Sequence, residues 1–132
     1  MMKAELDTLE IAPDPAELGR MRRFVRDQAA RRGLEERARF RAQLVATEAV
    51  TNAIRHGSDG DDPHPIAVGC RWDDRGFTVE VGDRGRFRRR DLSKPDDTGG
   101  RGLGLIERMT RRLDLETSER GTTLRMLVAG IL

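Results

Sequence analysis

The sequence is poor in the residues that support disulfides, metal clusters and membrane spans. It has a single cysteine, Cys70, so it cannot form an internal disulfide. One cysteine and two histidines, His56 and His64, at unrelated spacings give no zinc-binding pattern. No apolar run approaches the length of a membrane span or of a signal-peptide core. We therefore expect the chain to stay in the cytoplasm.

The charges nearly cancel, which gives no indication of nucleic-acid binding. Lysine and arginine together number 25 and aspartate and glutamate 23, so the formal net charge is only +2. The only lysines are Lys3 and Lys94, and a GC-rich coding bias explains the excess of arginine better than phosphate recognition does. The 132 residues are 36% hydrophobic and contain no repeat, low-complexity segment or long polar linker. We expect a single domain over residues 1–132.

Hydrophobic periodicity predicts an α+β fold. Helices are expected over residues 15–32, 35–55 and 103–113, and strands over residues 3–11, 66–72, 77–81, 115–118 and 122–128. Residues 73–76 are expected to form a hairpin turn, and Gly33 to end the first helix. Because the helices are grouped and the strands are mostly hairpin-linked, the helices should cover one face of a mixed, mostly antiparallel sheet, as in a two-layer α/β sandwich.

The most informative segment reads ATEAVTNAIRHG, over residues 46–57. At helical spacing, Glu48, Asn52 and His56 lie along one edge of the helix, beside a broad arc of alanine, valine and isoleucine. A carboxylate and an amide oxygen at the border of a core can bind Mg²⁺ and polarise a nucleophile. An isolated pair of this kind is usually only solvated, so the other motifs decide its meaning.

Three further segments accompany this helix. A strand ends at Gly82-Asp83-Arg84-Gly85, a glycine-rich run covers residues 98–106, and the chain closes with GTTLRM over residues 121–126. The glycine run is neither a P-loop nor a dinucleotide fingerprint, because the lysine and the G-x-G-x-x-G spacing are missing. It enters a helix, where free backbone N–H groups and the helix dipole favour anions. Without Cβ atoms, Gly100, Gly102 and Gly104 would let a triphosphate approach the main chain.

In their order and spacing, these segments resemble the motifs of the GHKL ATPase superfamily, from about Arg39 to Val128. The wording EAVTNAIRHG and the ending GTTLRM look most like the bacterial anti-sigma factor serine/threonine kinases. The resemblance implies the Bergerat ATP-binding fold and the cofactors ATP and Mg²⁺. It also implies two protein partners, a sigma factor that is held inactive and an anti-sigma factor antagonist that is phosphorylated.

The resemblance also assigns roles to individual residues. Glu48 corresponds to the general base and Asn52 to the Mg²⁺ ligand. Asp83 corresponds to the acceptor for the adenine amine, with Gly85 under the ring, and Thr123, or else Thr122, to the threonine that supports Asp83. The phosphates would be bound by Gly100, Gly102, Leu103 and Gly104. Residues 84–100 resemble the ATP lid, although the stretch at residues 83–87 is one residue shorter than the family's usual D-x-G-x-G-F.

Two other function classes remain open. The first is a non-catalytic ATP-binding module that controls a partner through its lid. The presence of Glu48 argues against this class, since nucleotide binding alone needs no general base. The second is a histidine-kinase catalytic domain, but no helical dimerisation segment with a phosphoacceptor histidine precedes the motifs. The family pairs through its N-terminal strand, so we also expect a homodimer through residues 3–11.

Overall fold

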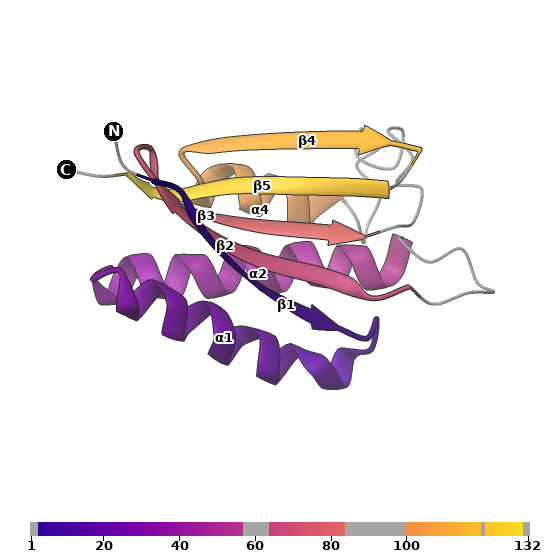
Figure 1. Ribbon diagram of the computed structural model, residues 1–132. Helices are drawn as coiled ribbons and strands as arrows, with labels where there is room; N and C mark the ends of the chain where they lie inside the picture. The colour runs from indigo at the N-terminus through magenta and orange to yellow at the C-terminus, as the bar shows by residue number, and fades with distance from the viewer. Residues whose placement is uncertain (1–2, 57–63, 84–99, 120, 131–132) are drawn as a thin grey trace.

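A computed structural model describes residues 3–56, 64–83, 100–119 and 121–130 of the chain. These residues form an α+β fold in which helices cover one face of a five-stranded sheet (Figure 1). The strands are β1 (Glu5–Ile11), β2 (Ile66–Asp73), β3 (Gly76–Asp83), β4 (Arg112–Ser118) and β5 (Gly121–Gly130), and the helices are α1 (Leu18–Arg31), α2 (Glu36–His56) and α4 (Gly100–Met109). The strand order is β1-β2-β3-β5-β4, and every described pairing is antiparallel. The predicted fold is confirmed, and the described sheet contains no parallel pair.

The start and end of α1 follow from local chemistry. The Oδ1 atom of Asp14 accepts a hydrogen bond of 2.9 Å from the backbone N–H of Ala16, and Pro15 begins a 3₁₀ turn (Pro15–Glu17) that leads into the helix. The helix stops at Gly33, whose φ of 76° lies in the left-handed region that favours glycine. The predicted helix over residues 15–32 is therefore present, and its first turn is a 3₁₀ turn instead of an α-helical one.

The hydrophobic core lies between the helices and one face of the sheet. Alternation along the strands directs Val68, Val79 and Met126 toward the helices, and all three are fully buried. Helix α2 crosses the middle of this layer and packs against β3, β5, α1 and α4. The small side chains Ala42, Ala46 and Ala49 on its buried face allow this close approach. The polar residues Glu48 and Asn52 lie toward the C-terminal end of this helix, and the packing of the helix keeps them close to the sheet.

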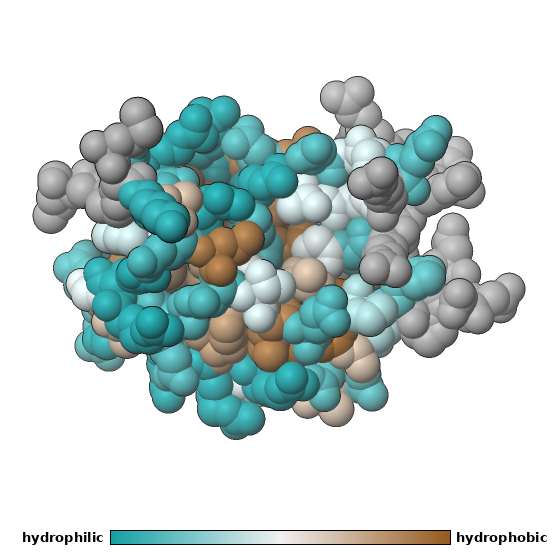
Figure 2. Space-filling view, viewed as in Figure 1, coloured by the Kyte–Doolittle hydropathy of each residue, from teal (hydrophilic) through white to brown (hydrophobic). Residues whose placement is uncertain are grey.

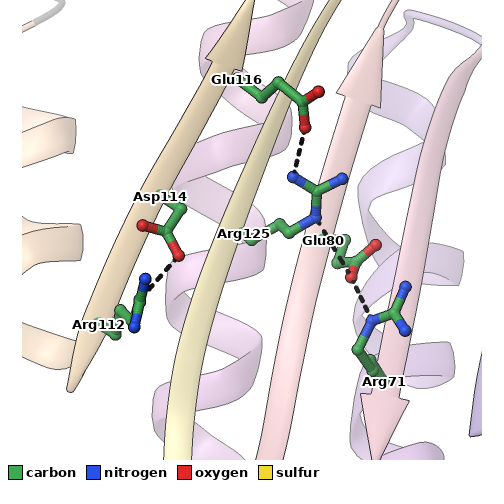
Figure 3. A network of polar contacts seen from close by, with 6 residues as sticks. All are labelled: Arg71, Glu80, Arg112, Asp114, Glu116 and Arg125. Carbon is green, nitrogen blue, oxygen red and sulfur yellow. Dashed lines mark hydrogen bonds and ion pairs between the residues drawn. The ribbon is translucent and has the colours of Figure 1, made fainter. Parts of the chain in front are cut away.

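The other face of the sheet carries a row of ion pairs (Figure 3). The Glu80 carboxylate lies 2.7 Å from Nε of Arg71 and 3.7 Å from Nε of Arg125. Nη1 of Arg125 also lies 2.8 Å from Glu116. The hydrogen bond that Arg71 donates to the Glu80 carboxylate raises the pKa of Arg71 above its ordinary value.

The surface seen in the same view as Figure 1 is dominated by hydrophilic residues, and hydrophobic residues are gathered toward its middle (Figure 2).

The predicted hairpin turn at residues 73–76 is confirmed. Asp73 pairs with Gly76 at the end of the β2–β3 ladder, and the Asp73 Oδ1 atom accepts a 2.9 Å hydrogen bond from the N–H of Arg75. Gly76 has a φ of 128°, and a Cβ atom there would lie 2.0 Å from the carbonyl oxygen of Ala129. No other residue fits this position without moving the neighbouring strand.

The boundaries of the third predicted helix were wrong at both ends. We expected it over residues 103–113, but α4 covers Gly100–Met109, so the glycine run forms its first turns instead of preceding it. At its end, the backbone N–H of Arg111 already bonds the carbonyl of Leu127 in β5, at 2.8 Å. Leu113 follows the helical spacing but belongs to β4, because pairing with β5 satisfies the backbone there.

Candidate functional site

Glu48 and Asn52 lie one turn apart near the end of α2, as the sequence predicts. Glu48 is half-buried and Asn52 is 7% exposed. Between them the helix presents Ala49 and Val50 to the core, which fixes the rotation of the helix about its axis. The carboxylate therefore lies at the border of the core, and the carboxamide lies just inside it.

The Asn52 carboxamide has no hydrogen-bond partner among the residues that the structure describes. A buried amide without a partner is uncommon in proteins and is frequently explained by a bound ion, water or ligand. Glu48 likewise forms no ion pair or hydrogen bond with another described residue. Gln28 in α1 is also buried and without a described partner, but no nucleotide motif surrounds it. The donor set at Asn52 suits a hard cation, since an amide oxygen is among the ligands that Mg²⁺ accepts.

Asp83 ends β3 and lies directly opposite Thr122 at the start of β5. Residues two apart in a strand share a face, so Asp83 lies on the helix-covered face with Val81, and Thr122 lies there with Leu124 and Met126. Thr122 is 7% exposed. These two side chains therefore lie on the same face of the sheet as α2, at the sheet end that α2 approaches with Asn52.

Thr123 lies on the opposite face of the sheet. It pairs with Gly82, and its Oγ1 atom lies 3.4 Å from the position that a Cβ on Gly82 would take. With Glu10, Pro65, Ala67, Gly82 and Asp83 it lines a hollow of about 340 Å³ at this end of the sheet. Thr123, which the resemblance assigns to the support of Asp83, therefore points away from the helices, whereas the alternative, Thr122, lies on the helix-covered face. The apolar alternation of Leu124, Met126 and Val128 in the sequence could have decided between them.

The predicted phosphate cradle falls in the first turns of α4. Gly100, Gly102 and Gly104 belong to this helix, and a Cβ atom on Gly104 would meet nothing within 4 Å. Helix α4 is anchored to the core through Ile106, which is fully buried, and it packs against α2. The start of a helix presents unpaired backbone N–H groups, so this arrangement suits an anion. Gly85 and residues 84–99 of the expected lid lie outside the described residues.

The cysteine, the tryptophan and the two histidines are not part of the candidate site described above. Cys70 is buried in β2, where burial, with smaller contributions from Asp7 and Glu80, raises the pKa of its thiol to about 12. Trp72 lies in the same strand and is partly buried. His56 is the last residue of α2, and His64 lies in the connection before β2. Among the described residues no cluster of histidine, cysteine, aspartate and glutamate could hold a metal ion.

Residues 11–128 match the model of the histidine kinase-like ATPase domain. The chain belongs to this family. Membership implies ATP binding by an ATPase- or kinase-like domain. A search of curated proteins found no match. No described helix is long and apolar enough to cross a membrane.

Several solved structures resemble this domain, and two of them are compared with it below. The structure of the RsbU and RsbW domains of Rv1364c from Mycobacterium tuberculosis matches with a TM-score of 0.68 and 18% sequence identity, over 92% of this chain and 31% of that one. The histidine kinase domain of the blue-light activated histidine kinase EL346 from Erythrobacter litoralis matches with a TM-score of 0.58 and 18% identity, over 86% of this chain and 60% of that one. The chain thus spans about a third of the first structure and three fifths of the second. At this identity the likeness shows the shared fold.

Proposed function

We propose that this domain is an ATP- and Mg²⁺-dependent serine/threonine protein kinase that also acts as an anti-sigma factor. The observation that carries the proposal is the buried Asn52 carboxamide, without a described hydrogen-bond partner, one helical turn after the half-buried Glu48. A protein that only bound nucleotide would need the amide but not the carboxylate. The resemblance of EAVTNAIRHG and GTTLRM to the anti-sigma factor kinases supports the finer assignment.

Each residue then has one role. Asn52 would hold Mg²⁺, which supplies charge neutralisation at the phosphates when bound. Glu48 accepts the proton of the serine or threonine hydroxyl of the substrate. The hydroxyl oxygen forms a bond to the γ-phosphorus as the bond between that phosphorus and the ADP oxygen breaks. Most of the rate enhancement comes from positioning and charge, so no covalent enzyme intermediate is required.

Asp83 would recognise adenine and Thr122 would support it. The adenine exocyclic amine is a donor and the Asp83 carboxylate is an acceptor, whereas the corresponding guanine position is itself an acceptor. A buried acceptor that meets another acceptor is costly, so the pairing selects ATP over GTP. The glycines at the start of α4 would bind the phosphates through backbone N–H groups.

The proposed partners are a sigma factor, which the domain sequesters, and a small antagonist protein, which it phosphorylates. Both follow from the resemblance to the anti-sigma factor kinases, and the fold shared with a structure that contains an RsbW domain is consistent with them. We also propose a homodimer formed through β1, which is an edge strand of the described sheet. Light scattering at tens of micromolar protein tests the dimer, and a monomer that persists with ATP contradicts it.

Two variants of α2 test the kinase assignment. Glu48→Gln keeps the size of the side chain, so ATP affinity should stay within a few-fold while phosphoryl transfer falls by about 10²–10⁴. Asn52→Ala should lose Mg²⁺-ATP binding and transfer together. Equilibrium ATP binding and single-turnover transfer from labelled ATP to the host's antagonist-like proteins measure both quantities. Undiminished transfer by Glu48→Gln excludes it as the base, and no transfer by the wild type favours a non-catalytic module.

A further inference from the structure

A second pocket lies at the other end of the molecule from Glu48 and Asn52. It is formed by the turn between α1 and α2, the end of β2 and the end of β5, at the left of Figure 1. Its volume is about 440 Å³. Arg41 in this pocket and Asn52 are separated by about 16 Å along α2, at 1.5 Å per residue. The pocket is therefore distinct from the candidate nucleotide site.

The charges in this pocket are mostly positive. Arg32, Arg41 and Arg111 line it, against a single carboxylate, Glu35. Arg32 is paired with Glu5, but neither Arg41 nor Arg111 has an ion pair or side-chain hydrogen bond to another described residue. Two guanidinium groups in one pocket that form no ion pair with another described residue favour an anionic ligand, because arginine presents a planar fork that matches a carboxylate.

The guanidinium group of Arg111 lies close to a glycine of β5. Its Nη1 and Cζ atoms lie 3.2 Å and 3.8 Å from the place that a Cβ atom on Gly130 would take. Any larger residue at position 130 would press against the guanidinium group. The end of β5 thus leaves room for this group beside the pocket.

The rest of the lining is apolar. Leu34, Ala38, Trp72 and Ala129 contribute to it, and Ala38 is 3% exposed. Trp72 is partly buried against the core and offers an aromatic surface. A ligand that fits both parts has a carboxylate next to a hydrophobic group. The rim residues Gly33, Glu35 and Arg111 are exposed, so an extended segment of another chain can enter from solvent.

We propose that this pocket binds an acidic segment of a partner protein, with a carboxylate held by Arg41 and Arg111 and a neighbouring apolar side chain against Trp72. The proposal does not depend on kinase activity. It gives the domain a protein-binding site that is separate from the candidate nucleotide site. The chemistry of the pocket defines the partner as acidic and partly hydrophobic, and excludes a basic one.

Trp72 provides a direct measurement, because the chain has one tryptophan and no tyrosine. Its emission should change in a saturable way on titration with an end-blocked peptide of alternating glutamate and leucine. The same peptide with glutamine in place of glutamate should give no saturable change. Arg41→Gln and Arg111→Gln should each weaken the acidic peptide about tenfold, the usual effect of losing a charge-assisted hydrogen bond.

Arg22→Gln is the matched control, because Arg22 is an exposed arginine of α1 outside the pocket and its loss removes the same charge. It should leave the peptide affinity within twofold, and all three variants should bind ATP like the wild type. The proposal is overturned by no saturable change with the acidic peptide, by an equal response to the glutamine peptide, or by an equal loss of affinity in Arg22→Gln. Saturation by inorganic phosphate at the affinity of the peptide would show a simple anion site and overturn it as well.

Discussion

Asp83 and Thr122 face each other across the β3–β5 ladder, on the side of the sheet that the helices cover. The next residue along the chain, Thr123, faces the other side. Two consecutive threonines therefore belong to different surfaces of the molecule. Their separate roles can be measured with the same substitution.

Thr122→Ala should weaken ATP binding by about tenfold, because Asp83 loses a neighbour that holds it in place. Thr123→Ala should leave ATP affinity within twofold. Asp83→Asn should weaken ATP by about 1–3 kcal/mol, since an amide can present a donor where the adenine amine also donates. Calorimetric titration with ATP and GTP measures all three. A larger effect for Thr123→Ala than for Thr122→Ala would contradict the assignment.

Asn52→Leu should separate stability from function. Because the buried carboxamide has no described partner, an apolar side chain of similar size should leave the nucleotide-free protein as stable or stabilise it by about 1 kcal/mol. The same variant should not bind Mg²⁺-ATP. Chemical denaturation and ATP titration give the two quantities. Gln28→Leu is the control, because it should change the free energy of unfolding in the same way as Asn52→Leu and yet leave ATP binding unchanged.

The stability of the domain should decrease at alkaline pH because of Cys70. Burial raises the pKa of the thiol to about 12 in the folded state, whereas in the unfolded chain the thiol ionises near its ordinary pKa of 9.0. The pKa is raised on folding, so the contribution is complete below pH 9.0 and is lost as the pH rises toward 12. The slope should approach about 1.4 kcal/mol per pH unit above pH 9.

Urea denaturation between about pH 8 and about pH 10.5 checks this pH dependence. Cys70→Ala removes the thiol and should flatten the slope in this range, although the smaller side chain lowers stability overall. The chain has no tyrosine, so no phenol titrates in the same range. Equal slopes for the two proteins would show that Cys70 is not the group responsible.

Glu80 should contribute more to stability than the other carboxylates of the ion-pair row. Its side chain is 12% exposed and lies between Arg71 and Arg125, whereas the Glu116 side chain is 65% exposed. Glu80→Gln should lower the free energy of unfolding by about 1–2 kcal/mol. Glu116→Gln should change it by less than about 0.5 kcal/mol. Denaturation at low and high salt measures both, and the Glu116 effect should be the more sensitive to salt.

Much of this fold could be predicted because its local signals agree with one another. The β2–β3 hairpin has alternating strands and a glycine at the position that requires a positive φ, and both features appear in the sequence. The edge formed by Glu48 and Asn52 follows from helical spacing alone. In both cases the information lies within a few residues.

The errors arose where distant parts of the chain decide the outcome. Leu113 continues the helical spacing of α4, but the ladder with β5 places it in a strand. The pocket around Trp72 could not be predicted, because it combines Arg41, Arg111 and Gly130 from three separate segments. Only the packed structure brings these residues together.

Strand β4 forms one edge of the described sheet, and this position has a consequence for the behaviour of the protein at high concentration. Strand β4 alternates Arg112, Asp114 and Glu116 on one side, and most of its residues are exposed. Open strand edges are templates on which other chains can pair and aggregate, and charged side chains along an edge oppose such pairing. This strand should therefore resist amyloid-like association, and neutralising its charges should make the domain prone to precipitation.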